Sequence, residues 1–265
     1  MLEGITLGRY IPGRSIIHTL DPRAKIIAVM LLIMSILMAG EPLLYLGLTS
    51  LIVVVLSMAM IPLGPVWKSI RLLWLILLFG FVFQAFFTPG QVMLTLGPLT
   101  VTREGLVGGG TMLWRLVNLI TVASLLTFTT TPIKLTAGLE YVLAPLNRVR
   151  VPVHELAMMM TIALRFVPTL LEEAQLVIKA QQSRGAAFTR GSIWRRAMSL
   201  VPILVPLFAG SLRRAEDLAT AMEARCYRGG VNRSRMNELA AGRADRVAVS
   251  LCTVIFLLSA GLRII

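Results

Sequence analysis

The chain has 265 residues, of which 56% are hydrophobic and 15% are charged, and its formal net charge is +13. Soluble domains have about a quarter of their residues charged, and a soluble protein of this size could not hide so much apolar surface. The excess must face lipid, so we expect an all-α polytopic membrane protein. Cys226 and Cys252 lie far apart in the sequence, with no spacing typical of a metal site or a disulfide framework.

Five apolar stretches are expected to cross the membrane as helices, because about 20 consecutive apolar residues span the hydrocarbon core. The first stretch is slightly short, but Lys25 can extend it by reaching toward the headgroups. Pro42 and Pro62 bound the second stretch, and a Thr-Pro-Gly turn signal at residues 88–90 follows the third. The expected spans are residues 26–40, 43–61, 72–87, 106–131 and 247–262.

Basic residues in the loops orient these spans, because Lys and Arg gather on the cytoplasmic side of a membrane. The loop between the first two spans has no Lys or Arg, and the loop between the third and fourth has only Arg103, beside Glu104. Basic residues do precede the first span and separate the second from the third: Arg9, Arg14, Arg23, Lys25, Lys68 and Arg71. We therefore expect a multi-pass protein of the inner (cytoplasmic) cell membrane with a cytoplasmic N-terminus. Five spans then place the C-terminus outside.

The segment from residue 132 to 246 carries most of the basic residues, yet its pattern predicts two long helices. Residues 153–184 favour a helix throughout, and Gly185 is suited to end it. At ~1.5 Å per residue this helix would reach roughly 48 Å. A second helix is expected over residues 199–225. Its apolar part, residues 200–212, is only ~13 residues long, so we expect it to pack beneath the membrane bundle. If it crossed the membrane instead, the C-terminus would be cytoplasmic.

The two long helices resemble each other weakly. A shift of 41 positions places identical residues on one another: Ala174 on Ala215, Ala180 on Ala221 and Arg184 on Arg225. An aromatic residue follows soon after each arginine. Either an internal repeat or a chance match between two alanine-rich helices explains these identities.

The sequence contains no catalytic motif. The glycine run at residues 108–110 is followed by no lysine, so it favours close helix packing over a phosphate-binding loop. His18 and His154 are isolated and favour structural roles. Arg115, the one charged residue within the expected spans, is either a functional group inside the membrane or a side chain that reaches the outer interface. We therefore expect a protein that is not an enzyme and uses no metal or cofactor.

Residues 12–25, which read PGRSIIHTLDPRAK, are similar to the P-G-x-S-x-x-H-x-L-D-P-R-x-K segment of the T component of energy-coupling factor (ECF) transporters. ECF transporters are ABC-type, ATP-driven importers of vitamins and metals. The matching residues, called the N-terminal motif below, are Pro12, Gly13, Ser15, His18, Leu20, Asp21, Pro22, Arg23 and Lys25.

The same family carries Ala-Arg-Gly motifs at the ends of two cytoplasmic coupling helices. Cysteine replaces glycine in the second motif here, and cysteine adopts a left-handed turn less readily than glycine does. The resemblance implies that both motifs dock two ABC-type ATPase subunits, and that a membrane-embedded S component binds the substrate. Arginine suits this role because it can bind a carboxylate through two parallel hydrogen bonds. The two coupling motifs are Ser183-Arg184-Gly185 and Ala224-Arg225-Cys226.

The predicted organisation has three parts. Residues 1–131 hold the N-terminal motif and four transmembrane helices, residues 132–246 form the cytoplasmic coupling region, and residues 247–265 form the last transmembrane helix.

Two other classes of protein remain open. A conventional ABC importer permease would carry substrate through its own dimer, and residues 173–174, Gly185 and residues 203–206 loosely resemble its cytoplasmic loop. A membrane-bound nucleic-acid binder is disfavoured, because acidic residues are mixed with the basic ones and no compact aromatic-basic patch occurs. The acidic residues concerned are Glu172, Glu173, Glu216, Asp217, Glu223 and Glu238. We thus expect the lipid bilayer, ATPases and an S component as partners, and no nucleic acid.

Overall fold

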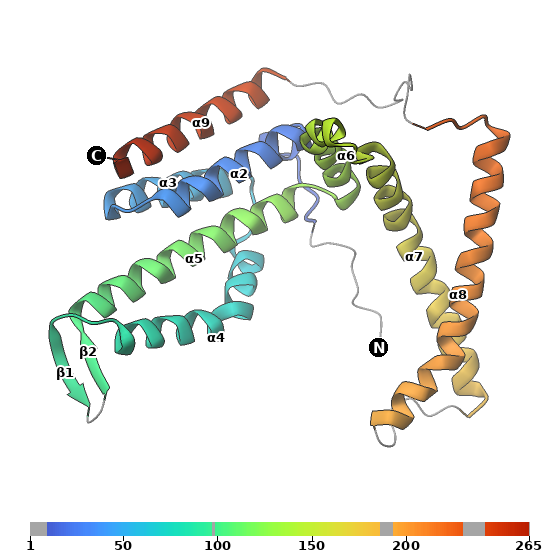
Figure 1. The fold of residues 1–265 in the computed structure, drawn as a ribbon, viewed down its shortest axis with the longest axis horizontal. Helices are drawn as coiled ribbons and strands as arrows, with labels where there is room; N and C mark the ends of the chain where they lie inside the picture. The colour runs from blue at the N-terminus through green and yellow to red at the C-terminus, as the bar shows by residue number, and fades with distance from the viewer. Residues whose placement is uncertain (1–9, 97–98, 186–192, 230–241, 265) are drawn as a thin grey trace. The chain divides into compact units, whose positions relative to one another are not determined.

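The computed structural model describes residues 10–96, 99–185, 193–229 and 242–264 (Figure 1). The chain divides into two compact units, and each is described by itself. We call residues 10–142 with 242–264 the helical bundle, and residues 143–185 with 193–229 the long-helix unit. Both units are built from α-helices, which confirms the all-α fold class.

The helical bundle contains the N-terminal motif and all five expected spans. Pro22 begins α2 and Pro42 begins α3, at positions where the missing N–H of proline would have had no helical partner. Thr102 caps α5, because its Oγ1 accepts a hydrogen bond of 3.1 Å from the Gly105 N–H. The bundle consists of α1 (Ile16–Thr19), α2 (Pro22–Met38), α3 (Pro42–Met58), α4 (Leu63–Phe87), β1 (Val92–Leu96), β2 (Leu99–Thr102), α5 (Arg103–Thr129), α6 (Pro132–Leu143) and α9 (Arg243–Ile264).

A short antiparallel hairpin, β1 with β2, joins α4 to α5 where the sequence indicates only a turn. Val92 pairs with Thr102 at its base, and Leu96 pairs with Leu99 at its tip. The Thr102 hydroxyl also donates a hydrogen bond of 2.7 Å to the Thr88 carbonyl, which closes the base. Strands of four and five residues leave too short a pattern to recognise from sequence.

The bundle core lies between α2, α3 and α5. Ile36, Tyr45 and Phe128 are nearly inaccessible to solvent, with exposed fractions of 0–2%. Close packing of α4 on α5 depends on glycine, as the run at residues 108–110 led us to expect. A Cβ added to Gly109 would lie 2.9 Å from the Phe81 ring. Gly105 and Gly109 form a small-xxx-small pattern that lets the two backbones approach.

The long-helix unit consists of a 3₁₀ helix and two helices of more than 30 residues. These are η1 (Ala144–Val149), α7 (Val153–Ser183) and α8 (Ile193–Ala224). The ends of α7 and the end of α8 match the predicted bounds, whereas α8 begins six residues before the expected start at residue 199. The apolar residues 200–212 are therefore an internal part of α8.

Five helices of the described chain are long and apolar enough to cross a membrane: α4, α5, α7, the Met198–Ala224 part of α8, and the Arg243–Leu262 part of α9. This set differs from the five predicted spans, because α2 and α3 have only 17 residues each and because α7 and α8 also qualify. A multi-pass membrane protein is thus supported. The cytoplasmic location of α7 and α8 stays a prediction.

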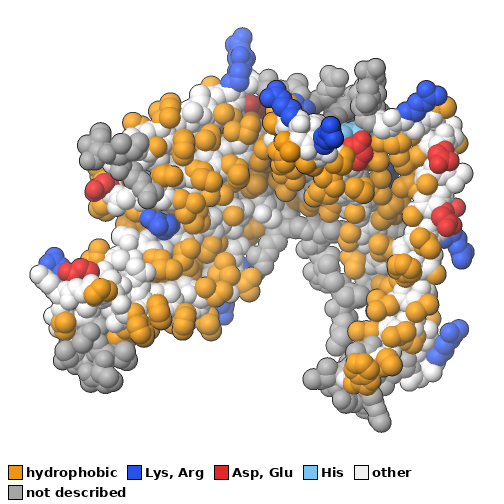
Figure 2. Space-filling model, in the orientation of Figure 1, with side chains coloured by type: hydrophobic (Ala, Val, Ile, Leu, Met, Phe, Trp, Pro, Cys, Tyr) orange, Lys and Arg blue, Asp and Glu red, His pale blue; other side chains and the backbone are white. Residues whose placement is uncertain are grey.

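Hydrophobic side chains are spread over the described surface visible in Figure 2. On α4 alone, Trp67, Leu72, Leu75 and Phe79 have exposed fractions of 67–72%. Apolar surface of this extent is not stable in water, and it indicates contact with lipid or with other membrane helices.

Candidate functional site

The N-terminal motif shapes the chain just before α2. The Ser15 Oγ accepts a hydrogen bond of 3.4 Å from the His18 N–H and lies 2.7 Å from His18 Nδ1. His18 Nε2 lies 3.1 Å from the Ile11 carbonyl oxygen, and the Ile11 N–H donates to the Phe128 carbonyl at 3.0 Å. A Cβ on Gly13 would lie 2.7 Å from the His18 ring, so only glycine fits there without displacement of the ring. These contacts fasten the motif to the end of α5.

Asp21 joins the start of α2 to the start of α9. Its Oδ1 accepts a hydrogen bond of 2.8 Å from the Arg23 N–H, which caps α2. Its own N–H donates at 2.8 Å to Oδ1 of Asp245, while Oδ2 of Asp245 accepts from the Gly242 N–H at 2.7 Å. Both aspartates are buried, with exposed fractions of 6%. The buried side chain of Asp245 therefore caps α9 and also accepts a hydrogen bond from the residue before α2, so it joins the starts of the two helices.

Lys25 ties the start of α2 to the end of α5. Its ammonium donates hydrogen bonds to the His18 carbonyl at 3.2 Å and to the Thr129 carbonyl at 3.1 Å. Thr129 is the last residue of α5, where the helix dipole favours a positive charge. Lys25 precedes the apolar residues 26–40, and its burial, together with the charge of Lys134, lowers the pKa of its ammonium to about 8.

The remaining motif residues also have structural positions. The Arg23 guanidinium lies 4.3 Å from the centre of the Tyr141 ring, which links α2 to α6. Pro22 is buried at the start of α2, and Leu20 packs against the core. Pro12 is exposed ahead of α1. The N-terminal motif thus holds helix ends together.

Arg115, in the middle of α5, is held inside the bundle. Its Nη2 donates to the Tyr45 hydroxyl at 2.6 Å and to the Ala39 carbonyl at 3.2 Å, and Tyr45 also donates to Ala39 at 2.7 Å. Ala39 directly follows α2, so the guanidinium neutralises a helix C-terminus. Nearby, Trp114 Nε1 donates to the Thr49 hydroxyl at 2.7 Å. This network favours a structural role for Arg115.

The two long helices are joined by an ion pair. Arg214 Nη2 of α8 lies 2.6 Å from Glu173 Oε2 of α7, and both side chains are about one-third exposed. A Cβ on Gly210 would lie 3.0 Å from Glu173 Oε1, so glycine lets α8 approach at this point. Figure 1 shows the two helices crossing, with their C-terminal ends pointing in opposite directions.

The 41-position shift that relates the two helices also relates the partners of this ion pair. Glu173 aligns with Arg214 under that shift, just as Arg184 aligns with Arg225. The contact between the helices therefore joins two positions that the shift places on one another. This observation favours a true internal repeat over a chance match.

Arg184 and Arg225 end their helices in the same conformation. Gly185 follows Arg184 with φ +87°, and Cys226 follows Arg225 with φ +57°, so both lie in the left-handed region. Both arginines are exposed. The second helix end therefore has a left-handed turn like that of the first, although it carries cysteine where the first carries glycine.

Backbone hydrogen bonds show that the end of α8 is a Schellman motif. The Cys226 N–H donates to the Glu223 carbonyl at 2.8 Å, and the Tyr227 N–H donates to the Met222 carbonyl at 3.0 Å. At α7 the Gly185 N–H makes the bond equivalent to the first of these, at 2.9 Å. A left-handed conformation costs a residue other than glycine roughly 1–2 kcal/mol. Cys226 adopts the left-handed conformation of the turn in spite of this cost.

The six residues of the coupling motifs thus lie at the C-terminal ends of two different helices, and the two ends have equivalent backbone turns. Each arginine lies 11 positions beyond the contact residue of its own helix, from 173 to 184 and from 214 to 225. At ~1.5 Å per residue each arm is about 16 Å long. Among the described residues, no group of three His, Cys, Asp or Glu side chains could hold a metal ion. Sequence reasoning missed Asp245, Glu173 and Arg214, although the 41-position shift could have paired the last two.

Residues 13–237 match a protein family described as CbiQ, cobalt transport protein. Relatives that carry the name energy-coupling factor transporter transmembrane protein EcfT include the following three. The relative from Acidaminococcus fermentans is 51% identical over 99% of this chain and 98% of its own. The relative from Thermosediminibacter oceani is 49% identical over 93% of each chain. The relative from Ruminiclostridium cellulolyticum is 47% identical over 97% of this chain and 96% of its own.

Proposed function

Because the chain belongs to the EcfT family of energy-coupling factor transporter transmembrane proteins, we propose that it couples two cytoplasmic ATPase subunits to a membrane-embedded S component. The ATPases hydrolyse ATP, the S component binds a vitamin or metal substrate, and this chain transmits movement between them without catalytic residues. Its N-terminus and long-helix unit lie in the cytoplasm.

The equivalence of the two helix ends carries this proposal. An ATPase pair offers two copies of one docking groove, so a single chain needs two copies of one docking element. The ends at Arg184 and Arg225 have matching backbone turns and lie on arms of equal length from the Glu173–Arg214 contact. Neither guanidinium has an ion-pair partner among the described residues. Each is free to bind a carboxylate of a partner through two hydrogen bonds.

The exposed apolar side chains of the bundle support the proposed contact with a membrane-embedded S component. Helix α4 presents large apolar residues along much of its length, including the stacked rings of Phe79, Phe83 and Phe87. Such a surface suits contact with lipid on one side and with the helices of an S component on another.

Reconstitution of ATP hydrolysis tests the proposal. The purified chain should hydrolyse no ATP, and vesicles that contain it should take up substrate only when two ATPase subunits and an S component are added. Affinity purification of this chain from its native membrane should recover both partner types. Robust ATP hydrolysis by the isolated chain, or recovery of a soluble substrate-binding protein in place of an S component, would contradict the proposal.

A further inference from the structure

Two cations lie in the N-terminal part of α4, at one end of a helix that is otherwise apolar. Lys68 and Arg71 are exposed, and no charged residue follows them before the helix ends at Phe87. They are three positions apart, so they share one face of α4. Trp67 and Trp74 lie four positions before and three after Arg71, with exposed fractions of 67% and 57%. We call these four residues, 67, 68, 71 and 74, the α4 basic face.

We propose that the α4 basic face binds the phosphate of an anionic phospholipid headgroup at the boundary of the membrane. The proposal does not depend on the coupling function, because it concerns only how α4 lies in the bilayer.

The length of α4 places its two cations at the level of the headgroups. The helix has 25 residues, whereas about 20 residues span the hydrocarbon core. A stretch of about 20 residues that ends with the helix at Phe87 begins at Lys68. Arg71 then lies about one turn deeper, by ~4.5 Å, and a long arginine side chain reaches the interface from that depth. Both cations can therefore meet a lipid phosphate.

Neither cation has a counter-ion within the described part of the protein. No hydrogen bond or ion pair joins Lys68 or Arg71 to another described residue. Helix α4 has no Asp or Glu. The one acidic residue of α5, Glu104, lies at the other end of α4, where it accepts a hydrogen bond of 2.6 Å from the Gln91 N–H. A charge at the membrane boundary is costly without a partner, so an anion from the surroundings stabilises it. At this depth lipid phosphate supplies that anion.

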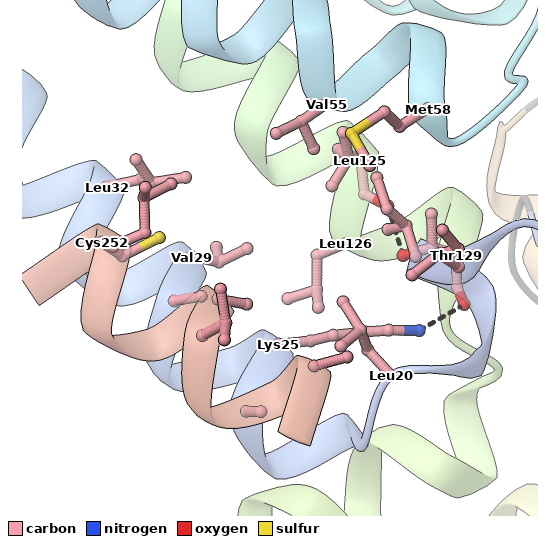
Figure 3. A pocket seen from close by; sticks show the side chains of 18 of the residues that line it. Leu20, Lys25, Val29, Leu32, Val55, Met58, Leu125, Leu126, Thr129 and Cys252 are labelled. Atoms are coloured by element: carbon pink, nitrogen blue, oxygen red, sulfur yellow. Dashed lines mark hydrogen bonds between the residues drawn. The ribbon is translucent and has the colours of Figure 1, made fainter. Parts of the chain in front are cut away.

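Two other cations of the bundle show how a charge is satisfied within the protein. The Lys25 ammonium donates to the Thr129 carbonyl, which Figure 3 marks with a dashed line. The Arg115 guanidinium donates to the Tyr45 hydroxyl at 2.6 Å. Both cations hold elements of the bundle together. The cations of the α4 basic face have no such contacts among the described residues, which leaves their N–H groups available to a ligand.

The neighbours of Arg71 are typical of the zone where a membrane meets water. Indole rings gather there, because the ring contacts acyl chains while its N–H bonds to headgroups. Trp67 and Trp74 lie on either side of Arg71, and the next turn presents Leu72 and Leu75 with exposed fractions of 72% and 71%. A guanidinium can bind two oxygens of one phosphate. The α4 basic face thus offers a cation to the phosphate and apolar surface to the acyl chains.

Quenching of tryptophan fluorescence by brominated lipid tests the proposal at the site itself. The chain has four tryptophans, and Trp114→Phe with Trp194→Phe leaves only the two of the α4 basic face. This full-length chain is reconstituted in phosphatidylcholine bilayers. A minor fraction of brominated lipid is added, either phosphatidylglycerol or phosphatidylcholine with the same acyl chains. Brominated phosphatidylglycerol should quench more strongly at equal mole fraction, because it concentrates beside the two rings.

Removal of the cations should remove this preference. Each basic residue near a membrane surface strengthens the binding of anionic lipid about fivefold. The preference for phosphatidylglycerol should therefore fall about fivefold in Arg71→Gln and disappear in the Lys68→Gln, Arg71→Gln double variant. The matched control is Lys179→Gln with Arg213→Gln, which removes the same two residue types from exposed positions on α7 and α8. It should leave the quenching unchanged.

Native mass spectrometry provides a second measurement that keeps all four tryptophans. After purification with phosphatidylglycerol, the Lys68→Gln, Arg71→Gln variant should retain one fewer of these lipids than the wild type. The Lys179→Gln, Arg213→Gln control should retain as many as the wild type. This measurement decides if the chain without Trp114 and Trp194 does not fold.

Equal quenching by the two brominated lipids in a chain with both cations would overturn the proposal. So would a preference for phosphatidylglycerol that survives the loss of Lys68 and Arg71. If the double variant retains its lipids but loses a partner subunit on affinity purification, the α4 basic face binds a protein carboxylate and the proposal is wrong.

Discussion

Cys226 occupies a position where the backbone favours glycine. Its φ of +57° matches the left-handed turn at Gly185, and the Schellman hydrogen bonds hold it there. The end of α8 therefore keeps this turn although the left-handed conformation strains the backbone at Cys226. We infer that the position of the preceding arginine, Arg225, depends on this turn.

Replacement of Cys226 by glycine should stabilise the end of α8. Relief of the left-handed strain, roughly 1–2 kcal/mol, exceeds the extra unfolded-state entropy of glycine, about 0.4–1 kcal/mol. Cys226→Gly should thus raise the unfolding temperature slightly, as measured by circular dichroism in detergent. Ala224→Gly, two positions earlier and inside the helix, is the matched control and should lower it. A lower unfolding temperature for Cys226→Gly would show that the turn is not strained.

Individual motif residues could be predicted from the sequence, but their partners could not. The N-terminal motif is confined to residues 12–25, and its capping residues Ser15 and Asp21 lie where a cap is expected. Asp245, by contrast, is 224 positions from Asp21, and nothing in the local pattern around either residue indicates their contact. Such long-range hydrogen bonds depend on how the helices pack.

The crossing of α7 and α8 is the central feature at the scale of elements. A helix pair that transmits movement must keep its crossing point while its ends are pulled. Glu173 and Arg214 mark that point, and Gly210 brings the backbones together beside it. We infer that this ion pair fixes the register of the two arms.

A double-mutant cycle measures the strength of this pair. Glu173→Gln and Arg214→Gln, alone and together, should reveal an interaction energy of about 0.5–1 kcal/mol in the free energy of unfolding, because the pair is partly exposed. Substrate uptake should fall in each single variant.

The chain supplies a control for that cycle one position away. Glu172 and Arg213 are also related by the 41-position shift, but both are exposed. The cycle of Glu172→Gln and Arg213→Gln should show no interaction energy. Equal interaction energies in the two cycles would mean that the two helices attract each other through their overall charge and that Glu173 and Arg214 make no specific contact.

Helices were easier to predict than the elements between them. The bounds of α3 follow from Pro42 and a long apolar run, and the end of α7 follows from Gly185. The start of α8 was misplaced because the predicted start followed the apolar run, although serine at position 192, directly before Ile193, is a favoured N-cap residue type. The β1–β2 hairpin was missed because short strands have little periodicity.

At the scale of the whole molecule, the path of the chain through the membrane is a prediction from charge. The distribution of Lys and Arg predicts that α7 and α8 stay in the cytoplasm. Length and composition would allow both to cross. The two possibilities differ in whether residues near the ends of α7 and α8 can be reached from outside.

Labelling of single cysteines separates these possibilities. In a background in which Cys226 and Cys252 are replaced, Gly40→Cys and Leu262→Cys should react with an impermeant maleimide added outside intact cells. Gln182→Cys should be protected until the cells are opened, and so should a cysteine at position 190, which lies outside the described residues. External labelling at position 182 or 190 would contradict the predicted topology. Protection of position 262 would mean that an additional helix crosses the membrane.

The central claim is that Arg184 and Arg225 dock the chain onto two ATPase subunits. Removal of a buried, hydrogen-bonded charge partner typically costs ~2–5 kcal/mol of binding free energy, mostly through faster dissociation. One remaining end still tethers the complex and keeps the local concentration high. Either single change to alanine should therefore weaken uptake more than assembly, and lysine should rescue only in part because it lacks the bidentate fork.

Co-purification of the ATPases with the Arg184→Ala, Arg225→Ala double variant tests this claim most directly. Arg228→Ala, three positions beyond Arg225, and Arg190→Ala, outside the described residues, remove the same positive charge away from the helix ends. The account predicts that the double variant inserts in the membrane but loses both ATPases, while the two controls keep them. If the double variant retains its ATPases and transports normally, or if the controls do equal damage, the two arginines belong to a general basic face and the docking account is wrong.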